Sequence, residues 1–120
     1  MMILIAGPYR GGTNDDPILI KMNLDRLELA ALPLFRKGHI PIIGEWVALP
    51  LMHLAGSKEF GDIIWDEMQY PVAHRLLEKC DAVLRIEGAS KGAENDVRIA
   101  KERDMKIYYS LDEIPNLTEK

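Results

Sequence analysis

Two loops carry the residue types that could do chemistry in this chain. The first runs from Gly7 to Asn14 and reads Gly-Pro-Tyr-Arg-Gly-Gly-Thr-Asn. Gly11 and Gly12 let backbone N–H groups approach an anion, and Arg10 adds a fixed charge on a planar fork. The loop lacks the G-x-G-x-x-G pattern of a dinucleotide site and the Gly-Lys-Ser/Thr of a P-loop. It indicates either an anion-binding turn or a tight turn with a solvated arginine.

The second segment, Gly88 to Asp96, is a loop that continues into the first turns of an expected helix. Its first five residues fit the G-x-S-x-G pattern of a serine-hydrolase nucleophile. Hydrolases of that fold place the histidine after the nucleophile, whereas the last histidine here, His74, precedes Ser90. We therefore favour an anion or hydroxyl site formed by Ser90 and the first N–H groups of the helix.

Two carboxylates of this segment lie in the first turns of the expected helix. Glu94 and Asp96 point roughly 200° apart, so only one of them can face a pocket. Glu94 lies four residues before Arg98, a spacing that predicts an exposed ion pair. Asp96 follows Ala93 by three residues and precedes Ala100 by four, along the apolar side. We expect Asp96 to border the buried face and Glu94 to lie at the surface. The favourable interaction with the helix dipole is enough to explain an acid in the first turn of a helix.

Alternating strands and helices must position these loops. We expect strands at 2–6, 39–43, 81–86 and 106–109, and helices at 18–37, 63–79 and 92–104. Pro41 favours a sheet edge, Pro33 predicts a kink or an early stop, and Pro71 predicts a break. Residues 44–60 are expected to form a long loop with one helical turn at most. Strands alternating with helices predict an α/β fold with a covered parallel sheet, whose ligands bind at the carboxyl ends of the strands.

Composition restricts the class of protein. The 120 residues are 48% hydrophobic, carry a net charge of -4 and suffice for one domain, 1–120. The absence of clustered Lys and Arg argues against a nucleic-acid polymer as partner, and no apolar run could span a membrane. The N-terminal residues are typical of a strand, not of a signal peptide. A single cysteine, Cys80, offers no disulfide or metal spacing, so we expect a cytoplasmic protein with a small-molecule partner.

The two loops, together with the run Cys80-Asp81-Ala82-Val83, resemble those of the nucleoside 2-deoxyribosyltransferase superfamily. The likeness is greatest to its small members, the 2′-deoxynucleoside 5′-monophosphate N-hydrolases, and covers residues 2–108, although only the loops are specific. It implies a flavodoxin-like (Rossmann-like) three-layer domain that assembles as a homo-oligomer, a dimer or larger. It also implies cleavage or transfer at the N-glycosidic bond of a nucleoside or nucleoside 5′-monophosphate, without a metal or another cofactor.

The resemblance also implies residue roles. Asp96 would attack the anomeric carbon, and Tyr9 would line the sugar pocket and orient that nucleophile. Arg10, the loop amides and Ser90 would hold a 5′-phosphate or 5′-hydroxyl. Asp81 occupies a position where family members typically have an aspartate, which can also have a structural role alone. The implied substrate-binding set is Gly7, Arg10, Gly11, Gly12, Asp81, Ser90 and Gly92.

The chain departs from the family pattern at two places. The family nucleophile is normally glutamate, and Asp96 is one methylene shorter; Glu94 could replace it if the helix begins later than expected. A family aspartate is missing near 73–74, so that either His74 or Asp66 replaces it or activity is weakened. The alternative function is a non-catalytic nucleotide-binding or regulatory domain of the same fold.

Four other side chains are weaker candidates. Trp46 and Trp65 could stack on a base, but large aromatics more often belong to a core or an interface. His53 lies in the segment expected to cover the site and could transfer a proton. Glu45 follows the second strand and is either a ligand-facing acid or a solvated loop acid.

Overall fold

Four parallel strands form the middle layer of the protein. A computed structural model describes residues 1–118 and places the strands β1 (Met2–Ala6), β2 (Ile40–Ile43), β3 (Ala82–Arg85) and β4 (Lys106–Tyr108) in the order β2-β1-β3-β4. Ile5 pairs with Ile43 on one side and with Leu84 on the other, so β1 is central. β2 lies at an edge, as Pro41 predicts, because an edge strand leaves one side unpaired.

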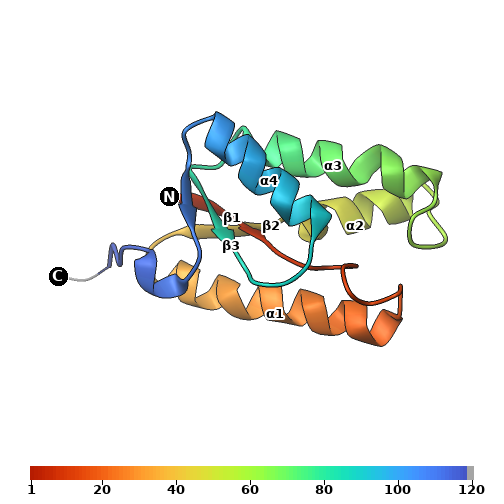
Figure 1. The fold of residues 1–120 in the computed structure, drawn as a ribbon, viewed down its shortest axis with the longest axis horizontal. Coiled ribbons are helices and arrows are strands. Elements are labelled where there is room, and N and C mark those ends of the chain that lie inside the picture. The colour runs from red at the N-terminus through yellow and green to blue at the C-terminus, as the bar shows by residue number, and fades with distance from the viewer. Residues whose placement is uncertain (119–120) are drawn as a thin grey trace.

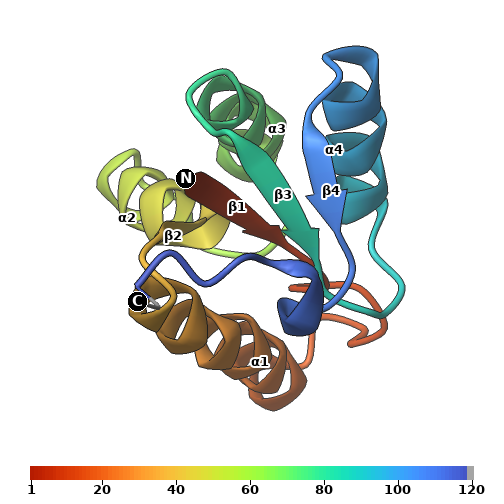
Figure 2. The same ribbon diagram turned by 90° about the vertical axis from the view of Figure 1, so that its left-hand side faces the viewer.

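Helices cover both faces of this sheet (Figures 1 and 2). The helix α1 (Pro17–Arg36) and the short 3₁₀ helix η1 (Leu111–Glu113) lie on one face, and α3 (Ile63–Leu77) and α4 (Lys91–Glu102) lie on the other. The helix α2 (Gly44–Leu54) packs beside α3. The predicted α/β, flavodoxin-like three-layer fold is confirmed. No helix of residues 1–118 combines the length and the hydropathy needed to cross a membrane.

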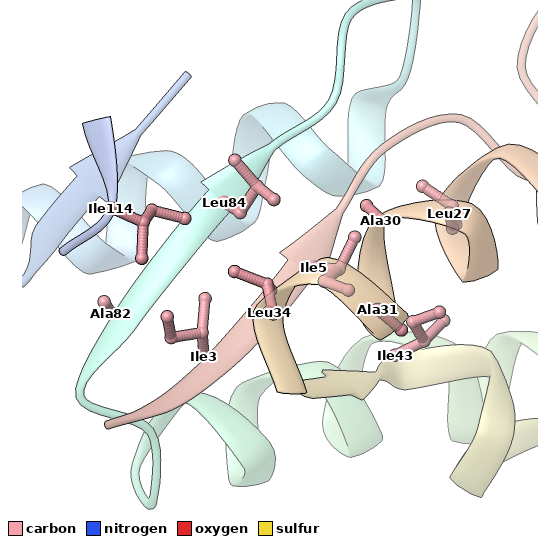
Figure 3. Close-up of a cluster of buried hydrophobic side chains, with 10 residues drawn as sticks. All are labelled: Ile3, Ile5, Leu27, Ala30, Ala31, Leu34, Ile43, Ala82, Leu84 and Ile114. Atoms are coloured by element: carbon pink, nitrogen blue, oxygen red, sulfur yellow. The ribbon is translucent and has the colours of Figure 1, made fainter. Parts of the chain in front are cut away.

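Each face of the sheet has its own apolar core. Ile3, Ile5 and Leu84 point toward Leu27 and Leu34 of α1 (Figure 3). On the other face Leu4, Ala6 and Val83 meet Leu77, Ala93 and Ala100 of α3 and α4. Burying a Leu or Ile side chain contributes roughly 1.5–3 kcal/mol, so the two cores fix β1 and β3 between them. The carboxyl ends of these strands are therefore rigid supports for the loops that follow.

Three prolines that were expected to end or interrupt helices lie inside helices in the structure. Residues 44–60 were predicted to form a loop, but α2 spans Gly44–Leu54 with Pro50 inside it. Likewise α1 continues past Pro33 to Arg36 without an early stop, and α3 passes through Pro71 unbroken. A proline removes one helical hydrogen bond, but an apolar face that packs on neighbouring elements offsets that loss.

Candidate functional site

A cavity of about 530 Å³ opens at the carboxyl end of β1. Residues from β1, both predicted loops and the helices α2, α3 and α4 line it; among them are Tyr9, Arg10, Gly11, Glu45, Gln69, Tyr70, Ser90, Gly92 and Asp96. The chain leaves β1 toward β2 on one side, whereas β3 and β4 lie on the other. Ligands of open parallel sheets bind at such a switch in strand order, and the volume suits a small molecule.

Asp96 is buried in the wall of this cavity. Its side chain lies on the apolar side of α4, its residue is only 7% exposed, and its Oδ1 atom has no hydrogen-bond partner. Burial, and secondarily the charge of Glu45, raise the pKa of Asp96 to about 7, although Arg85 acts in the opposite direction. The predicted orientation of Asp96 is confirmed. A buried carboxyl oxygen without a partner is costly unless a ligand uses it.

Glu45 lies in the first turn of α2, two residues after β2 ends. The side chain lines the same cavity as Asp96, and burial raises its pKa to about 7. Within residues 1–118 no Lys or Arg forms an ion pair with it. Glu45 therefore faces the cavity, as one of its two predicted positions requires, and the alternative prediction of a solvated loop acid was wrong. Its position just after a strand was the sequence signal that could have made Glu45 a stronger candidate for the site.

Tyr9 sits on a cluster of aromatic rings. Its ring stacks on Trp65 with centroids 6.0 Å apart and meets the edge of Phe60 at 6.4 Å. Burial, and then the charge of Glu45, raise the pKa of the Tyr9 phenol. Trp65 is only 5% exposed, so it supports Tyr9 from behind and offers no face to a base.

Arg10 is held on three sides. Its Nε and Nη2 atoms donate to the two carboxylate oxygens of Asp15 at 2.8 and 3.0 Å. Its guanidinium lies over the Trp65 ring, 5.2 Å from the centroid. Gly61 has a positive φ of 77°, and a Cβ there would lie 2.9 Å from Nη2. The Arg10 guanidinium is thus fixed at the cavity, and the Asp15 carboxylate compensates its charge.

The two predicted loops meet at the cavity. Gly88 has a φ of 123°, and a Cβ there would lie 2.7 Å from the Pro8 ring. Ser90 is the N-cap of α4: its hydroxyl accepts from the Ala93 N–H at 3.0 Å and lies 3.5 Å from the Gly7 carbonyl oxygen. The open end of α4 therefore faces the cavity beside the first loop, an arrangement that favours anionic or hydroxyl groups.

Two predicted site residues are not brought to this cavity. Glu94 is exposed and pairs with Arg85 at 3.2 Å; the predicted pair with Arg98 is wrong, because Arg98 bonds to Glu102 instead. Asp81 precedes β3 at the opposite end of the sheet, where its carboxylate accepts from the Met2 N–H at 2.7 Å. Asp81 therefore fixes the start of two strands.

Apart from Glu45, the weaker candidates lie outside the cavity. His74 stacks on Tyr70 and bonds to Asn95 at 2.9 Å, and Asp66 and His53 are exposed. The Trp46 indole donates to Glu28 at 2.7 Å, on the surface. At the place of the missing family aspartate, the cavity wall holds Ala73. Neither His74 nor Asp66 supplies the missing carboxylate.

No protein-family model, curated protein or solved structure matches the chain. Within residues 1–118 no group of three His, Cys, Asp or Glu side chains could hold a metal ion. The fold and the cavity define an α/β domain with two buried carboxyls, those of Glu45 and Asp96, in a cavity at the carboxyl end of its parallel sheet.

Proposed function

We propose that the protein cleaves the N-glycosidic bond of a nucleoside or nucleoside 5′-monophosphate, with Asp96 as the nucleophile. The observation that carries this proposal is the buried Asp96 carboxyl, whose Oδ1 has no partner and which lines a cavity at the switch point of the sheet. The resemblance of both loops to those of deoxyribosyltransferases supports the same assignment.

A carboxylate suits this reaction for a chemical reason. The bond between base and sugar breaks through a transition state in which positive charge develops at the anomeric carbon. An anionic oxygen beside that carbon stabilises the charge or traps the sugar as an ester, which water then hydrolyses. A second acceptor in place of water would give transfer of the sugar.

The remaining cavity residues suit the other parts of such a substrate. The phenol of Tyr9 and the open end of α4 offer hydrogen-bond donors for sugar hydroxyls. The apolar surface of Ala73 and Ala93 in the wall leaves room for a flat base. These groups position a substrate, whereas the cleavage of the glycosidic bond is carried out by the carboxyls of the cavity.

Release of free base from a panel of 2′-deoxynucleosides and their 5′-monophosphates tests the proposal. We expect turnover by the wild type and its loss in Asp96→Asn, which keeps the size of the side chain. Glu94→Gln is the matched control, because it removes a carboxylate from the same helix outside the cavity. Binding without turnover by the wild type would favour the non-catalytic nucleotide-binding domain. Equal loss in both variants would refute the role of Asp96.

A further inference from the structure

We propose that Glu45 is the acid that protonates the departing base, an inference that rests on the proposed cleavage of the glycosidic bond. When that bond breaks, its electron pair stays on a nitrogen of the base, which leaves readily only if it is protonated. The carboxylate that attacks the sugar cannot also be the proton donor in the same step. The reaction therefore needs a second acid at the cavity.

Glu45 and Asp96 enter the cavity from two different walls. β2 and β3 flank β1, so their carboxyl ends are two strand spacings apart, about 10 Å. Glu45 follows β2, and Asp96 stands on the helix that follows β3. A sugar and base that lie over the end of β1 can thus have the anomeric carbon beside Asp96 and a base nitrogen beside Glu45.

The surroundings of the two carboxyls differ by one cation. Arg85, in β3, favours the ionised form of Asp96. Glu45 has no such partner: the phenol of Tyr9 faces it from the first loop, and the α3 wall of the cavity presents the neutral Gln69 and Tyr70. Both carboxyls have a pKa raised to about 7, and each carboxylate disfavours ionisation of the other, so near neutral pH the pair holds one proton. Arg85 favours the arrangement in which Asp96 is the anion and Glu45 keeps the proton. An anionic nucleophile and a neutral acid then coexist near neutral pH.

The proposed steps balance in protons and electrons. In the first, an Asp96 oxygen bonds to the anomeric carbon as the C–N bond breaks, and the Glu45 proton moves to the base nitrogen. The products are neutral base, a sugar ester on Asp96 and a Glu45 carboxylate. In the second, water attacks the anomeric carbon and gives a proton to Glu45, while the ester electron pair returns to Asp96.

A leaving group that needs no proton tests this role. The substrates are 2′-deoxyguanosine and 7-methyl-2′-deoxyguanosine, whose base is already cationic. We expect Glu45→Gln to lower kcat on the first by about a hundredfold or more and on the second by less than tenfold. Asp96→Asn should lose both activities, and Glu102→Gln, which removes an exposed carboxylate of the same helix that pairs with Arg98, should keep both. Equal loss on the two substrates in Glu45→Gln, or no loss on either, would overturn the assignment.

A second measurement needs no substrate. Carboxyl ¹³C titration of the full chain by NMR should show that Asp96 titrates at lower pH in Glu45→Gln, because the neighbouring negative charge is gone. An Asp96 titration unchanged by this substitution would overturn the pairing. If the carboxyls are coupled but the wild type releases base from no nucleoside, the proposed function fails, and the proton-donor role fails with it.

Discussion

Gly11 lies so close to Ala89 that a Cβ atom on Gly11 would come within 2.1 Å of the Ala89 carbonyl oxygen. This approach joins the loop after β1 to the loop after β3. Because only glycine leaves room for that carbonyl, the spacing between the Arg10 end and the Ser90 end of the cavity depends on this residue.

Gly11→Ala should therefore lower both stability and binding. The added methyl group must displace backbone, so we expect the free energy of unfolding to fall by about 1–3 kcal/mol, as measured by chemical denaturation. Gly44→Ala is the control, because a Cβ at Gly44 meets nothing within 4 Å and its φ is ordinary for an L-residue. A Gly11→Ala protein as stable as the control would show that the loops do not meet as described.

The raised pKa of Asp96 predicts a pH dependence of stability. The folded chain binds this proton up to about pH 7, whereas the unfolded chain releases it near the ordinary aspartate pKa of 3.8. Between these values the folded state holds more protons, so the contribution of Asp96 to stability falls as the pH rises.

Asp96→Asn removes this contribution. Relative to the wild type, the variant should gain up to about 4 kcal/mol between pH 4 and pH 8. Denaturation curves at pH 4, 6 and 8 measure the difference. A difference that does not change with pH would mean that the carboxyl is ionised and solvated in the folded chain.

Asp15 should control the preference between a 5′-hydroxyl and a 5′-phosphate. Its carboxylate occupies the two Arg10 donors that a phosphate would use. Asp15→Asn tolerates the left-handed backbone at this position (φ 58°) and frees the fork. We expect the affinity for a nucleoside 5′-monophosphate relative to its nucleoside to rise about tenfold, measured by calorimetry.

Asp16→Asn is the matched control for this experiment. Asp16 caps α1 by accepting from the Ile18 N–H at 2.9 Å, and asparagine caps equally well. It removes the same charge one residue away from the Arg10 fork. An equal change of affinity in both variants would contradict a specific effect of Asp15.

Asp62 should fix the start of α3, and through it the aromatic support of Tyr9. Its carboxylate accepts from the Trp65 N–H at 3.0 Å, and this and other hydrogen bonds lower its pKa to about 2. A lowered folded-state pKa adds stability above the unfolded value, which is lost as the pH falls toward 2. Asp62→Ala should lower Tm by a few degrees at pH 7 and by less at pH 2. A loss of the same size at both values would contradict this role.

The sequence predicts the sheet and the orientation of Asp96 because both follow from local periodicity. The apolar run 2–6 can only be a buried strand, and the spacing of Ala93, Asp96 and Ala100 fixes one side of a helix. The loop from Tyr9 to Gly12 stayed open between an anion-binding turn and a tight turn with a solvated arginine, because glycines beside an arginine at a strand end are compatible with both; the structure places it in the cavity wall.

The remaining parts depend on packing between distant segments. Helix α2 is stabilised by the contact of Ala48 and Met52 with Trp65, which no local pattern around Pro50 reveals. The pairs Glu94–Arg85 and Arg10–Asp15 were missed for a related reason, since helical spacing predicts partners only within one helix. The position of Glu45 after β2 was a usable signal, but that its side chain lines the cavity depends on helix α2, which the sequence did not predict.

The most direct test of the account is to trap the sugar on the protein. A nucleoside with fluorine at the sugar 2′-position slows hydrolysis of an ester intermediate, because the electronegative group destabilises positive charge at the anomeric carbon. Peptide mass spectrometry of the wild type after this treatment should show one added sugar on Asp96, with free base released in equal amount. A sugar on Glu45 or Glu94, or base release without any ester, would contradict nucleophilic attack by Asp96.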